Sequence, residues 1–571
     1  MELPKMFTPK TFEELEAKIA ETKQNGETWD CDLSDLNVTE IIGFLFSGCS
    51  GLTSVVIPEG VTLIGESAFY GCSGLTSIKV AEGNKVYDSR ESCNAIIETA
   101  TNKLVCGCKT TVIPNSVTEI GEDAFRGCTG LTSVVIPEGV TEIKGEAFWG
   151  CTGLTSVVIP EGVTKIERYA FSGCSGLTSV VIPESVTEIG DDAFNDCTGL
   201  TSIVIPESVT EIGKEAFSGC SLTSVVIPEG VTKIERYAFF GCTGLTSVVI
   251  PEGVTEIKGG AFWGCTGLTS VVIPEGVKKI GYQAFCSCCG LTSVVIGEGV
   301  TEIGEWAFHD CSGLTSVVIP DSVTEIGDNA FSGCTGLTSV AIPKGLTEIG
   351  RYAFRGCSGL TSVVIPEGVT LIGISAFWGC SGLTSVVIPE GVTEIGRYAF
   401  RGCSGLTSIK VAEGNKVYDS RESCNAIIET ATNKLVCGCE ATIIPEGVTE
   451  IGVWAFGYCT GLTSVVIPEG VTTIGERAFS GCKNLKEVTL PVGVKKIDEY
   501  AFEYCRALET IYVPASFRFR SCCSQSNPLS RCCLSMCKIF AKKAGYYKKR
   551  LPEELHDKIK ELEPVKKAKK K

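Results

Sequence analysis

The side chains that most often perform chemistry are scarce and scattered in this sequence. The two histidines, His309 and His556, lie far apart in the chain. Other copies of a repeat described below carry Trp, Ser, Asn, Arg or Tyr at the position of His309, which predicts a surface substitution. General acid–base catalysis needs a positioned proton carrier, most often histidine. The sequence also lacks a phosphate-binding loop, a nucleophile elbow and a zinc-protease motif. We expect no enzymatic activity, no catalytic residue and no cofactor.

Cysteine is the exception, with 32 copies, some of them closely spaced. The close groups are Cys106-Gly107-Cys108, Cys437-Gly438-Cys439 and residues 286–289. Zinc sites pair two such groups or add histidines at matched spacing, which these groups lack. We therefore predict no metal site and interpret most cysteines as small buried apolar side chains. A further cluster near the C-terminus could form a thiol or lipidation site; it contains Cys522, Cys523, Cys532, Cys533 and Cys537.

Most of the cysteines mark an internal repeat of 23 residues. Gly130–Ile143 recurs almost unchanged along the chain, and each copy closes with Ala-Phe-x-Gly-Cys. One step is 22 residues and two are 56. The phased cysteines are residues 49, 72, 128, 151, 174, 197, 220, 242, 265, 288, 311, 334, 357, 380, 403, 459, 482 and 505. A fixed period of this length predicts a solenoid in which each turn is stabilised by stacking on its neighbours.

Two longer units interrupt the period, and their sequences at 78–108 and 409–439 are identical. With 18 phased turns they give about 20 turns in all. Within a turn, alternation places Leu131, Val134 and Ile136 inward and Val135 outward, before Pro137 ends the strand. The fold class is thus α/β: a solenoid of short parallel strands with turns and short helical segments.

This repeat resembles the BspA-type, or Treponema pallidum-type, leucine-rich repeat. The pattern Leu-x-x-Val-x-Ile-Pro-x-x-Val-x-x-Ile-Gly-x-x-Ala-Phe-x-Gly-Cys carries the resemblance over about 41–515, and the long units resemble a variant turn of that family. The resemblance implies a solenoid that binds proteins, since family members include bacterial adhesins for host matrix proteins and for other bacteria. It favours a non-enzymatic protein-binding scaffold and implies an adhesin-like surface protein that contacts host or bacterial proteins through the solenoid face. The alternative is a structural or antigenic repeat protein without a single ligand.

Three regions follow from these patterns. Residues 1–40 are expected to form a helix and cap, because Thr11-Phe12-Glu13-Glu14 fits a capping box. Residues 41–515 form the solenoid, with the long variant units at 78–110 and 409–441. Residues 516–571 form a cysteine-containing tail with 16 Lys and Arg against 5 Asp and Glu.

The charge distribution limits the partners. The tail carries +11 of a net charge of −17, so the rest of the chain carries −28, which disfavours nucleic acid as a ligand of the solenoid. The basic tail could contact anionic surfaces. No transmembrane segment or secretory signal is evident, which predicts a cytoplasmic protein; the alternative is a surface or secreted protein exported by a non-standard route.

Two sets of side chains are candidates for contact with a partner protein. The first is an outward strand stripe that hardly changes between copies, formed by Val135, Val158, Val181, Val204, Val226, Val249, Val272, Val295 and Val318. Ala341 and Lys410 interrupt it. A uniform stripe suits a partner gripped at many weak points, although recent duplication also explains it. The second set is aromatic and lies at positions that vary between copies, namely Trp149, Tyr169, Trp263, Trp306, Tyr352, Trp378 and Trp454.

Overall fold

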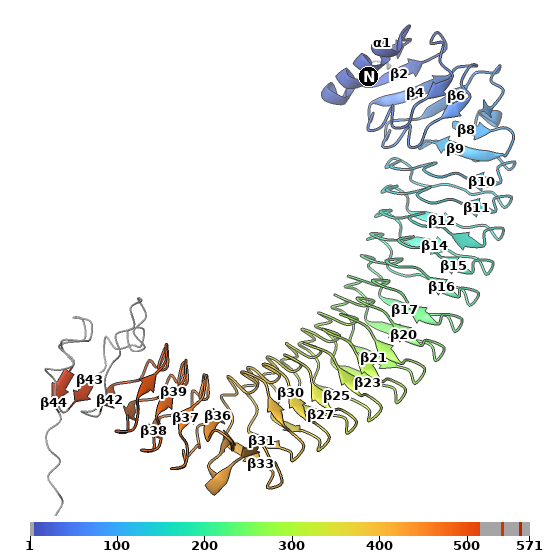
Figure 1. Ribbon diagram of the computed structural model, residues 1–571. Helices are drawn as coiled ribbons and strands as arrows, with labels where there is room; N and C mark the ends of the chain where they lie inside the picture. The colour runs from blue at the N-terminus through green and yellow to red at the C-terminus, as the bar shows by residue number, and fades with distance from the viewer. Residues whose placement is uncertain (1–4, 514–537, 542–558, 562–571) are drawn as a thin grey trace, which may run out of the picture. The chain divides into compact units, whose positions relative to one another are not determined.

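The computed structural model describes residues 5–513, 538–541 and 559–561. It divides into two units, Met1–Leu291 and Thr292–Lys571, which are described separately. Each is a β-solenoid whose turns are built mainly from two short strands (Figure 1). The strands mark about 22 turns, against about 20 predicted from the repeat.

One turn shows how the sequence produces the fold. Ser156–Val158 (β12) alternates exposed, buried and exposed, as a strand with one buried face requires. Pro160 then ends this strand because it has no N–H to donate, and Lys165–Ile166 (β13) forms a second strand. A turn segment carrying Ala170 and Phe171 closes the loop.

The two strand series pair in register one repeat apart. Ser156 lies opposite Ser179 in the first series and Ile166 opposite Ile189 in the second. In the first unit the first series is β1 (Lys5–Phe7), β2 (Trp29–Asp32), β4 (Leu52–Ile57), β6 (Ser77–Val80), β12, β14 (Ser179–Val181), β17 (Ser224–Val226), β19 (Ser247–Val249) and β21 (Ser270–Ile273). The second series is β3 (Glu40–Ile41), β5 (Leu63–Ile64), β10 (Glu119–Ile120), β11 (Glu142–Ile143), β13, β15 (Glu188–Ile189), β16 (Glu211–Ile212), β18 (Lys233–Ile234), β20 (Glu256–Ile257) and β22 (Lys279–Ile280).

The second unit repeats this arrangement. Its first series is β23 (Ser293–Ile296), β25 (Ser316–Val318), β27 (Ser339–Ala341), β29 (Ser362–Val364), β31 (Ser385–Ile388), β33 (Ser408–Val411), β38 (Ser464–Val466), β40 (Glu487–Thr489) and β42 (Thr510–Val513). Its second series is β24 (Glu302–Ile303), β26 (Glu325–Ile326), β28 (Glu348–Ile349), β30 (Leu371–Ile372), β32 (Glu394–Ile395), β37 (Glu450–Ile451), β39 (Thr473–Ile474) and β41 (Lys496–Ile497). Beyond β42, the described strands β43 (Lys538–Ala541) and β44 (Ile559–Glu561) continue the parallel pairing.

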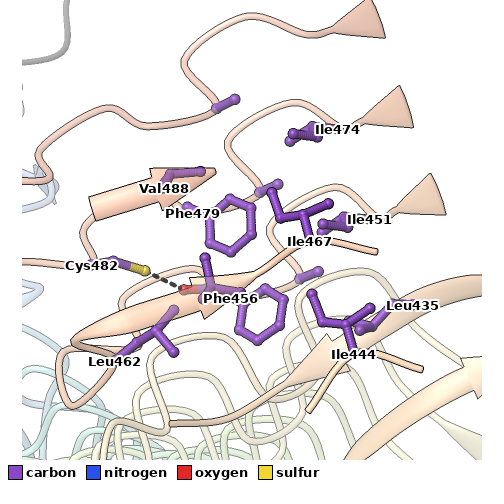
Figure 2. Close-up of a cluster of buried hydrophobic side chains, with 14 of the residues drawn as sticks. Leu435, Ile444, Ile451, Phe456, Leu462, Ile467, Ile474, Phe479, Cys482 and Val488 are labelled. Atoms are coloured by element: carbon purple, nitrogen blue, oxygen red, sulfur yellow. Dashed lines mark hydrogen bonds between the residues drawn. The ribbon is translucent and has the colours of Figure 1, made fainter. Parts of the chain in front are cut away.

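A column of phenylalanine rings fills the core beneath the turn segments. Phe194, Phe217 and Phe239 are fully buried and stack with centroids 5.5 Å apart. The phased cysteine of each turn lies beside this column, where the Cys174 thiol donates a hydrogen bond to the Phe148 carbonyl at 3.1 Å. Figure 2 shows the same packing in the second unit around Phe456, Phe479 and Cys482. Each turn therefore bonds and packs mainly against its immediate neighbours.

The long units insert a hairpin into this stack. In the first, β8 (Ala95–Glu98) is antiparallel to both β7 (Tyr87–Asp88) and β9 (Lys103–Gly107), with the 3-10 helix η1 (Arg90–Ser92) between β7 and β8. The second copy comprises β34 (Tyr418–Asp419), η2 (Arg421–Ser423), β35 (Ala426–Glu429) and β36 (Lys434–Gly438). β9 and β36 then pair in parallel with the next strand of the second series, β10 and β37.

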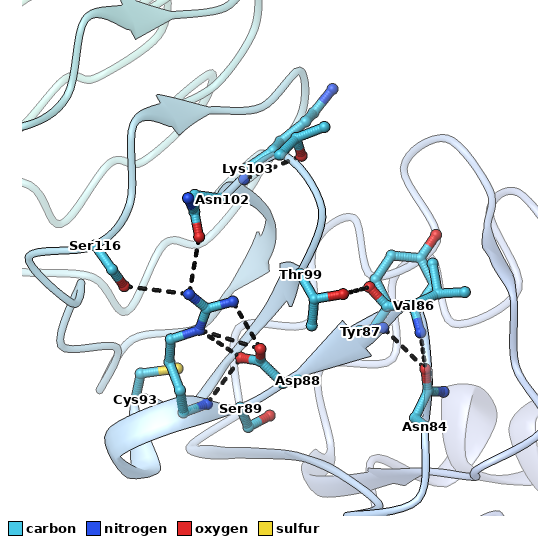
Figure 3. A network of polar contacts seen from close by, with 12 residues as sticks. Asn84, Val86, Tyr87, Asp88, Ser89, Cys93, Thr99, Asn102, Lys103 and Ser116 are labelled. Atoms are coloured by element: carbon cyan, nitrogen blue, oxygen red, sulfur yellow. Dashed lines mark hydrogen bonds and ion pairs between the residues drawn. The ribbon is translucent and has the colours of Figure 1, made fainter.

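An arginine network fixes the shape of each long unit. The Arg90 guanidinium donates to Asp88 at 2.7 and 2.8 Å and to Asn102 at 2.9 Å (Figure 3). Arg421 makes the equivalent contacts with Asp419 and Asn433. Because charge-assisted, two-pronged contacts of this kind are the stronger hydrogen bonds in proteins, we assign these residues a structural role.

The N-terminal region contains the expected helix and one element that the sequence analysis did not predict. The helix α1 spans Phe12–Asn25; the Thr11 side chain accepts from the Glu14 N–H, and Gly26 ends the helix in the left-handed conformation. β1 precedes the helix and pairs in parallel with β2. Three residues are too short to show a strand period, so only their pairing reveals them.

Candidate functional site

The first strand series carries an exposed apolar stripe, which we call the valine face. In the first unit its members are 56–84 % exposed: Val135, Val158, Val181, Val204, Val226, Val249 and Val272. In the second unit Val295 and Val318 are 57 % and 71 % exposed, and Ala341 and Lys410 stand in the same row. Val158 lies opposite Val181 and Val226 opposite Val249 on paired strands, which are about 4.8 Å apart. Val135 and Val204 are exposed but lie outside the assigned strands.

The threonines beside the valine face form hydrogen bonds to one another from turn to turn. The Thr155 hydroxyl donates to the Thr132 carbonyl at 3.2 Å, and Thr178 donates to Thr155 at 3.0 Å. Thr141 and Thr118 form an equivalent bond in the second series. The repetition of these threonines is therefore explained by structure, whereas the exposed valines make no comparable contact.

The turn segments form a different surface, which we call the corner face. The residue before each Ala-Phe pair has a left-handed backbone, as at Tyr169 (φ 57°), Trp306 (φ 61°) and Tyr352 (φ 58°). Glycine is favoured in this conformation and aromatic residues are uncommon in it. Only Gly260 among these described corner positions takes the favoured residue. Asp123, Asp192 and Asn329 also suit this conformation, whereas the aromatic side chains at other corners are not selected by backbone preference.

Arginine and aromatic side chains stack on the corner face. In the first unit, Arg126 lies over Trp149 at 4.1 Å and over Tyr70 at 5.2 Å, and it pairs with Asp123 and Glu146 at 3.1 and 2.9 Å. Arg168 lies over Tyr169 at 4.7 Å. These contacts keep the rings close to the surface and leave them only partly accessible.

The structure places the candidate aromatic residues on this face without joining them into one site. Trp454 is buried, at 9 % exposed, and the others are half-buried: Trp149, Tyr169, Trp263, Trp306, Tyr352 and Trp378. Trp454 is covered by Arg401, whose guanidinium carbon lies 3.4 Å from the ring centroid. His309 lies on the same face, half-buried against Trp306 and 3.2 Å from Asp310.

The phased cysteines lie inside the solenoid. Burial raises the pKa of the Cys174 and Cys242 thiols to about 12, and it raises that of Cys151 well above its ordinary value. Such thiols are poor nucleophiles and poor metal ligands at neutral pH. Within the described ranges, no group of three or more His, Cys, Asp or Glu is placed to hold a metal ion.

The tail residues singled out in the sequence lie outside the described residues. These are Cys522, Cys523, Cys532, Cys533, Cys537, His556 and the basic run Lys566–Lys571. In the part of the chain that the structure describes, no helix is long and apolar enough to cross a membrane.

Two cavities beside the long units were not predicted. One of about 240 Å³ lies against Phe69, Gly107 and Arg126, and one of about 410 Å³ lies against Arg401, Gly438 and Trp454. The available signal was the glycine of Cys106-Gly107-Cys108 and Cys437-Gly438-Cys439. It stands where a standard turn has phenylalanine, an equivalence that only the backbone hydrogen bonds of the turn segments show, from Gly107 to Ala124 and from Gly438 to Ala455.

Comparison with known proteins agrees with the architecture. The family model described as the BspA type leucine-rich repeat region matches residues 23–104, 95–222, 210–338, 303–427 and 428–542. The chain therefore belongs to the BspA-type leucine-rich repeat family, whose members are repeat scaffolds. None of the curated proteins matches the chain significantly.

Several solved structures are similar to this chain. A leucine-rich cell surface protein from Faecalibacterium prausnitzii is 34 % identical, covering 46 % of this chain and 78 % of its own, with a TM-score of 0.40. A leucine-rich repeat protein from Bacteroides ovatus is 27 % identical, covering 75 % and 93 %, with a TM-score of 0.41. One from Eubacterium ventriosum is 23 % identical, covering 66 % and 88 %, with a TM-score of 0.36.

Proposed function

We propose that the chain is a non-enzymatic scaffold that binds another protein through the valine face. The observation that carries this proposal is the repeated exposed valine, more than half exposed in each copy and held in register where the strands pair, as at Val158 with Val181 and Val226 with Val249. Contiguous exposed apolar patches beyond a few hundred Å² are uncommon on monomers and mark interaction sites. Since the row repeats one contact at every turn, an extended partner gains affinity from many weak contacts.

The negative charges beside the valine face favour a partner with basic side chains. The turn after each strand carries an exposed carboxylate in most copies, as at Glu138, Glu161 and Glu184. An apolar row flanked by an acidic row fits an extended segment that alternates apolar and basic residues. Such complementarity raises the association rate and fixes the register.

Substitution on the valine face is expected to weaken binding by at least about tenfold. Threonine keeps the branched shape that suits a strand while replacing one methyl group by a hydroxyl, so the sheet is retained and the apolar row is lost. Surface plasmon resonance against purified host matrix proteins and bacterial surface proteins measures the change. The variant combines Val158→Thr, Val181→Thr, Val226→Thr and Val249→Thr.

A matched control alters the second strand series instead. Glu188→Gln together with Glu211→Gln changes outward side chains of the same unit and leaves the valines intact. This control is expected to bind within about twofold of the unmodified protein. If the valine variant retains full affinity, or if the glutamine control loses as much, the valine face is not the binding surface.

The partner class that the family favours requires the protein to be reachable from outside the cell. The many thiols do not argue against such a location, because burial of Cys174 and its equivalents protects them from oxidation. Protease added to intact cells is expected to remove the protein while sparing a cytoplasmic marker. Survival of the full-length chain would favour an intracellular partner.

A structural or antigenic repeat protein is the second candidate. The threonine bonds favour it, because they explain part of the surface uniformity without any ligand. This candidate predicts that the number of turns differs between isolates and that removing whole turns changes no binding activity. Loss of binding on removal of turns supports the scaffold instead.

A further inference from the structure

The two cavities arise where the long units break the phenylalanine column. In a standard turn the Phe125 N–H donates to the Ala147 carbonyl. At the second long unit the Gly438 N–H takes this place and donates to Ala455 at 2.9 Å, but glycine brings no ring. The Phe456 ring packs on Gly438 so closely that a Cβ there would lie 2.3 Å from it. The column therefore has a gap between Phe400 and Phe456.

The larger cavity, next to the second long unit, has the size of a small-molecule site. Its volume of about 410 Å³ lies within the roughly 300–1,000 Å³ typical of ligand pockets. Its apolar lining includes Phe400, Val436 and Ala455, while Tyr398, Tyr418 and Trp454 supply aromatic walls. All of these residues belong to the second unit.

Arg401 gives this cavity an uncompensated positive charge. Its guanidinium lies over Trp454 at 3.4 Å and over Trp378 and Tyr458 at 4.9 Å. It is hydrogen-bonded to the Tyr458 side chain but has no carboxylate partner among the described residues. Its Nε is buried without a hydrogen-bond partner. Burial lowers the pKa of Arg401, but arginine remains charged in proteins.

The two other cations that line the cavity are each near a carboxylate. Lys434 pairs with Glu450 at 2.9 Å, and Arg397 lies 3.8 Å from Glu476. The Glu429 carboxylate also lines the cavity; it accepts a hydrogen bond from the Thr432 hydroxyl and keeps its negative charge. Among the three cations of the lining, Arg401 is therefore the one without a carboxylate partner.

The first long unit provides an internal comparison, because its inserted sequence is identical. Its cavity is smaller, about 240 Å³, and the nearby arginine, Arg126, is neutralised by Asp123 and Glu146. The position of Asp123 is held by Trp454 beside the second long unit, and that of Glu146 by Arg477. The two arginines are not equivalent in sequence, because the position of Arg126 is held by Gly457 and that of Arg401 by Tyr70. The cavity of the first long unit is thus lined by a neutralised arginine, and that of the second by an arginine without a carboxylate partner.

We propose that the cavity beside the second long unit binds a small carboxylate with a flat apolar body. The carboxylate pairs with the Arg401 guanidinium, whose planar fork matches its geometry. The apolar body lies between Tyr398, Trp454 and Val436. The neutralised arginine of the first long unit leaves its cavity without this selectivity.

Ligand-observed NMR titration of the full-length protein tests the assignment with two probes of the same shape. Indole-3-acetate carries the carboxylate, and indole-3-acetamide is its neutral counterpart. We expect saturable binding of the acid at one site, at least about tenfold tighter than the amide. The variant Arg401→Gln is expected to weaken binding of the acid at least tenfold, while Arg401→Lys, which keeps the charge and loses the fork, gives an intermediate loss.

Two further variants keep the test decisive. Arg355→Gln is the matched control, because Arg355 stacks on Trp378 at 4.5 Å in the same way but does not line the cavity; its binding is expected to be unchanged. Val436→Phe fills the cavity from the opposite wall and is expected to abolish binding without altering Arg401. Equal affinity for acid and amide, absence of saturable binding, or full binding by the folded Arg401→Gln or Val436→Phe protein would overturn the proposal.

Discussion

Replacing Phe217 by alanine is expected to lower the free energy of unfolding of the first unit by about 3–5 kcal/mol. Phe217 is fully buried and stacks on Phe194 and Phe239, so the substitution removes two ring contacts and leaves a void between neighbouring turns. Urea unfolding followed by far-ultraviolet circular dichroism measures the loss. The effect is large because a turn has few contacts beyond its two neighbours.

Val226→Ala is the matched control for Phe217→Ala. Val226 lies one turn later, but its side chain is 59 % exposed and outside the core. Its substitution is expected to change the free energy of unfolding by about 0.5 kcal/mol or less. A loss at Phe217 no larger than at Val226 would contradict the assignment of the phenylalanine column as the core.

Stability is expected to fall steeply between pH 9 and pH 10 under reducing conditions. Burial raises the pKa of the Cys174 thiol from 9.0 to about 12. Above pH 9 the unfolded chain releases this proton while the folded chain retains it, so the unfolded state binds fewer protons and stability decreases as pH rises. The contribution is complete below pH 9 and is lost progressively up to about pH 12. At pH 10 each such thiol costs about 1.4 kcal/mol.

The contribution of one thiol is isolated by Cys174→Ala. This variant is expected to be less stable than the unmodified protein at pH 8 but to lose about 1.4 kcal/mol less between pH 8 and pH 10. Urea midpoints measured across this range in the presence of a reductant compare the two pH slopes. Identical slopes would show that the Cys174 thiol ionises in the folded state as it does in the unfolded chain.

The repeating fold could be predicted from the sequence because the same alternation of buried and exposed residues recurs in many copies. Alternation identified Leu131 and Ile136 as inward and Val135 as outward, and the structure confirms these directions. Val134, also predicted to point inward, is half-buried, and residues 131–136 of this copy are not assigned as a strand. The interpretation of Cys151 as a buried apolar side chain also agrees with the structure, which adds a hydrogen bond to the Phe125 carbonyl. The family assignment rested on the same repeated residues.

The parts that were missed depend on three-dimensional pairing. The left-handed backbone at Tyr169 could not be predicted from the sequence. Glycine, the residue that would indicate it, occupies this repeat position only at Gly260 among the described copies. The cavities depend on Gly107 and Gly438 taking the backbone place of a phenylalanine, which the backbone hydrogen bonds of the turn segments show and the spacing does not. Which surface binds a partner was undecided from the sequence and stands here as a proposal.

The left-handed corner separates what can change in this chain from what cannot. The residue there is half-buried in most described copies and buried in others, such as Ser375 and Asn329, while an Ala-Phe pair such as Ala170 and Phe171 follows it in every described copy after the first. Exchanges at the half-buried corners are therefore expected to disturb the packing of adjacent turns less than exchanges within the phenylalanine column. This repeat position holds tryptophan in one copy, aspartate in another and tyrosine in a third, as at Trp306, Asp192 and Tyr169. Related chains can in this way differ in the side chains on the corner face while they keep the same core.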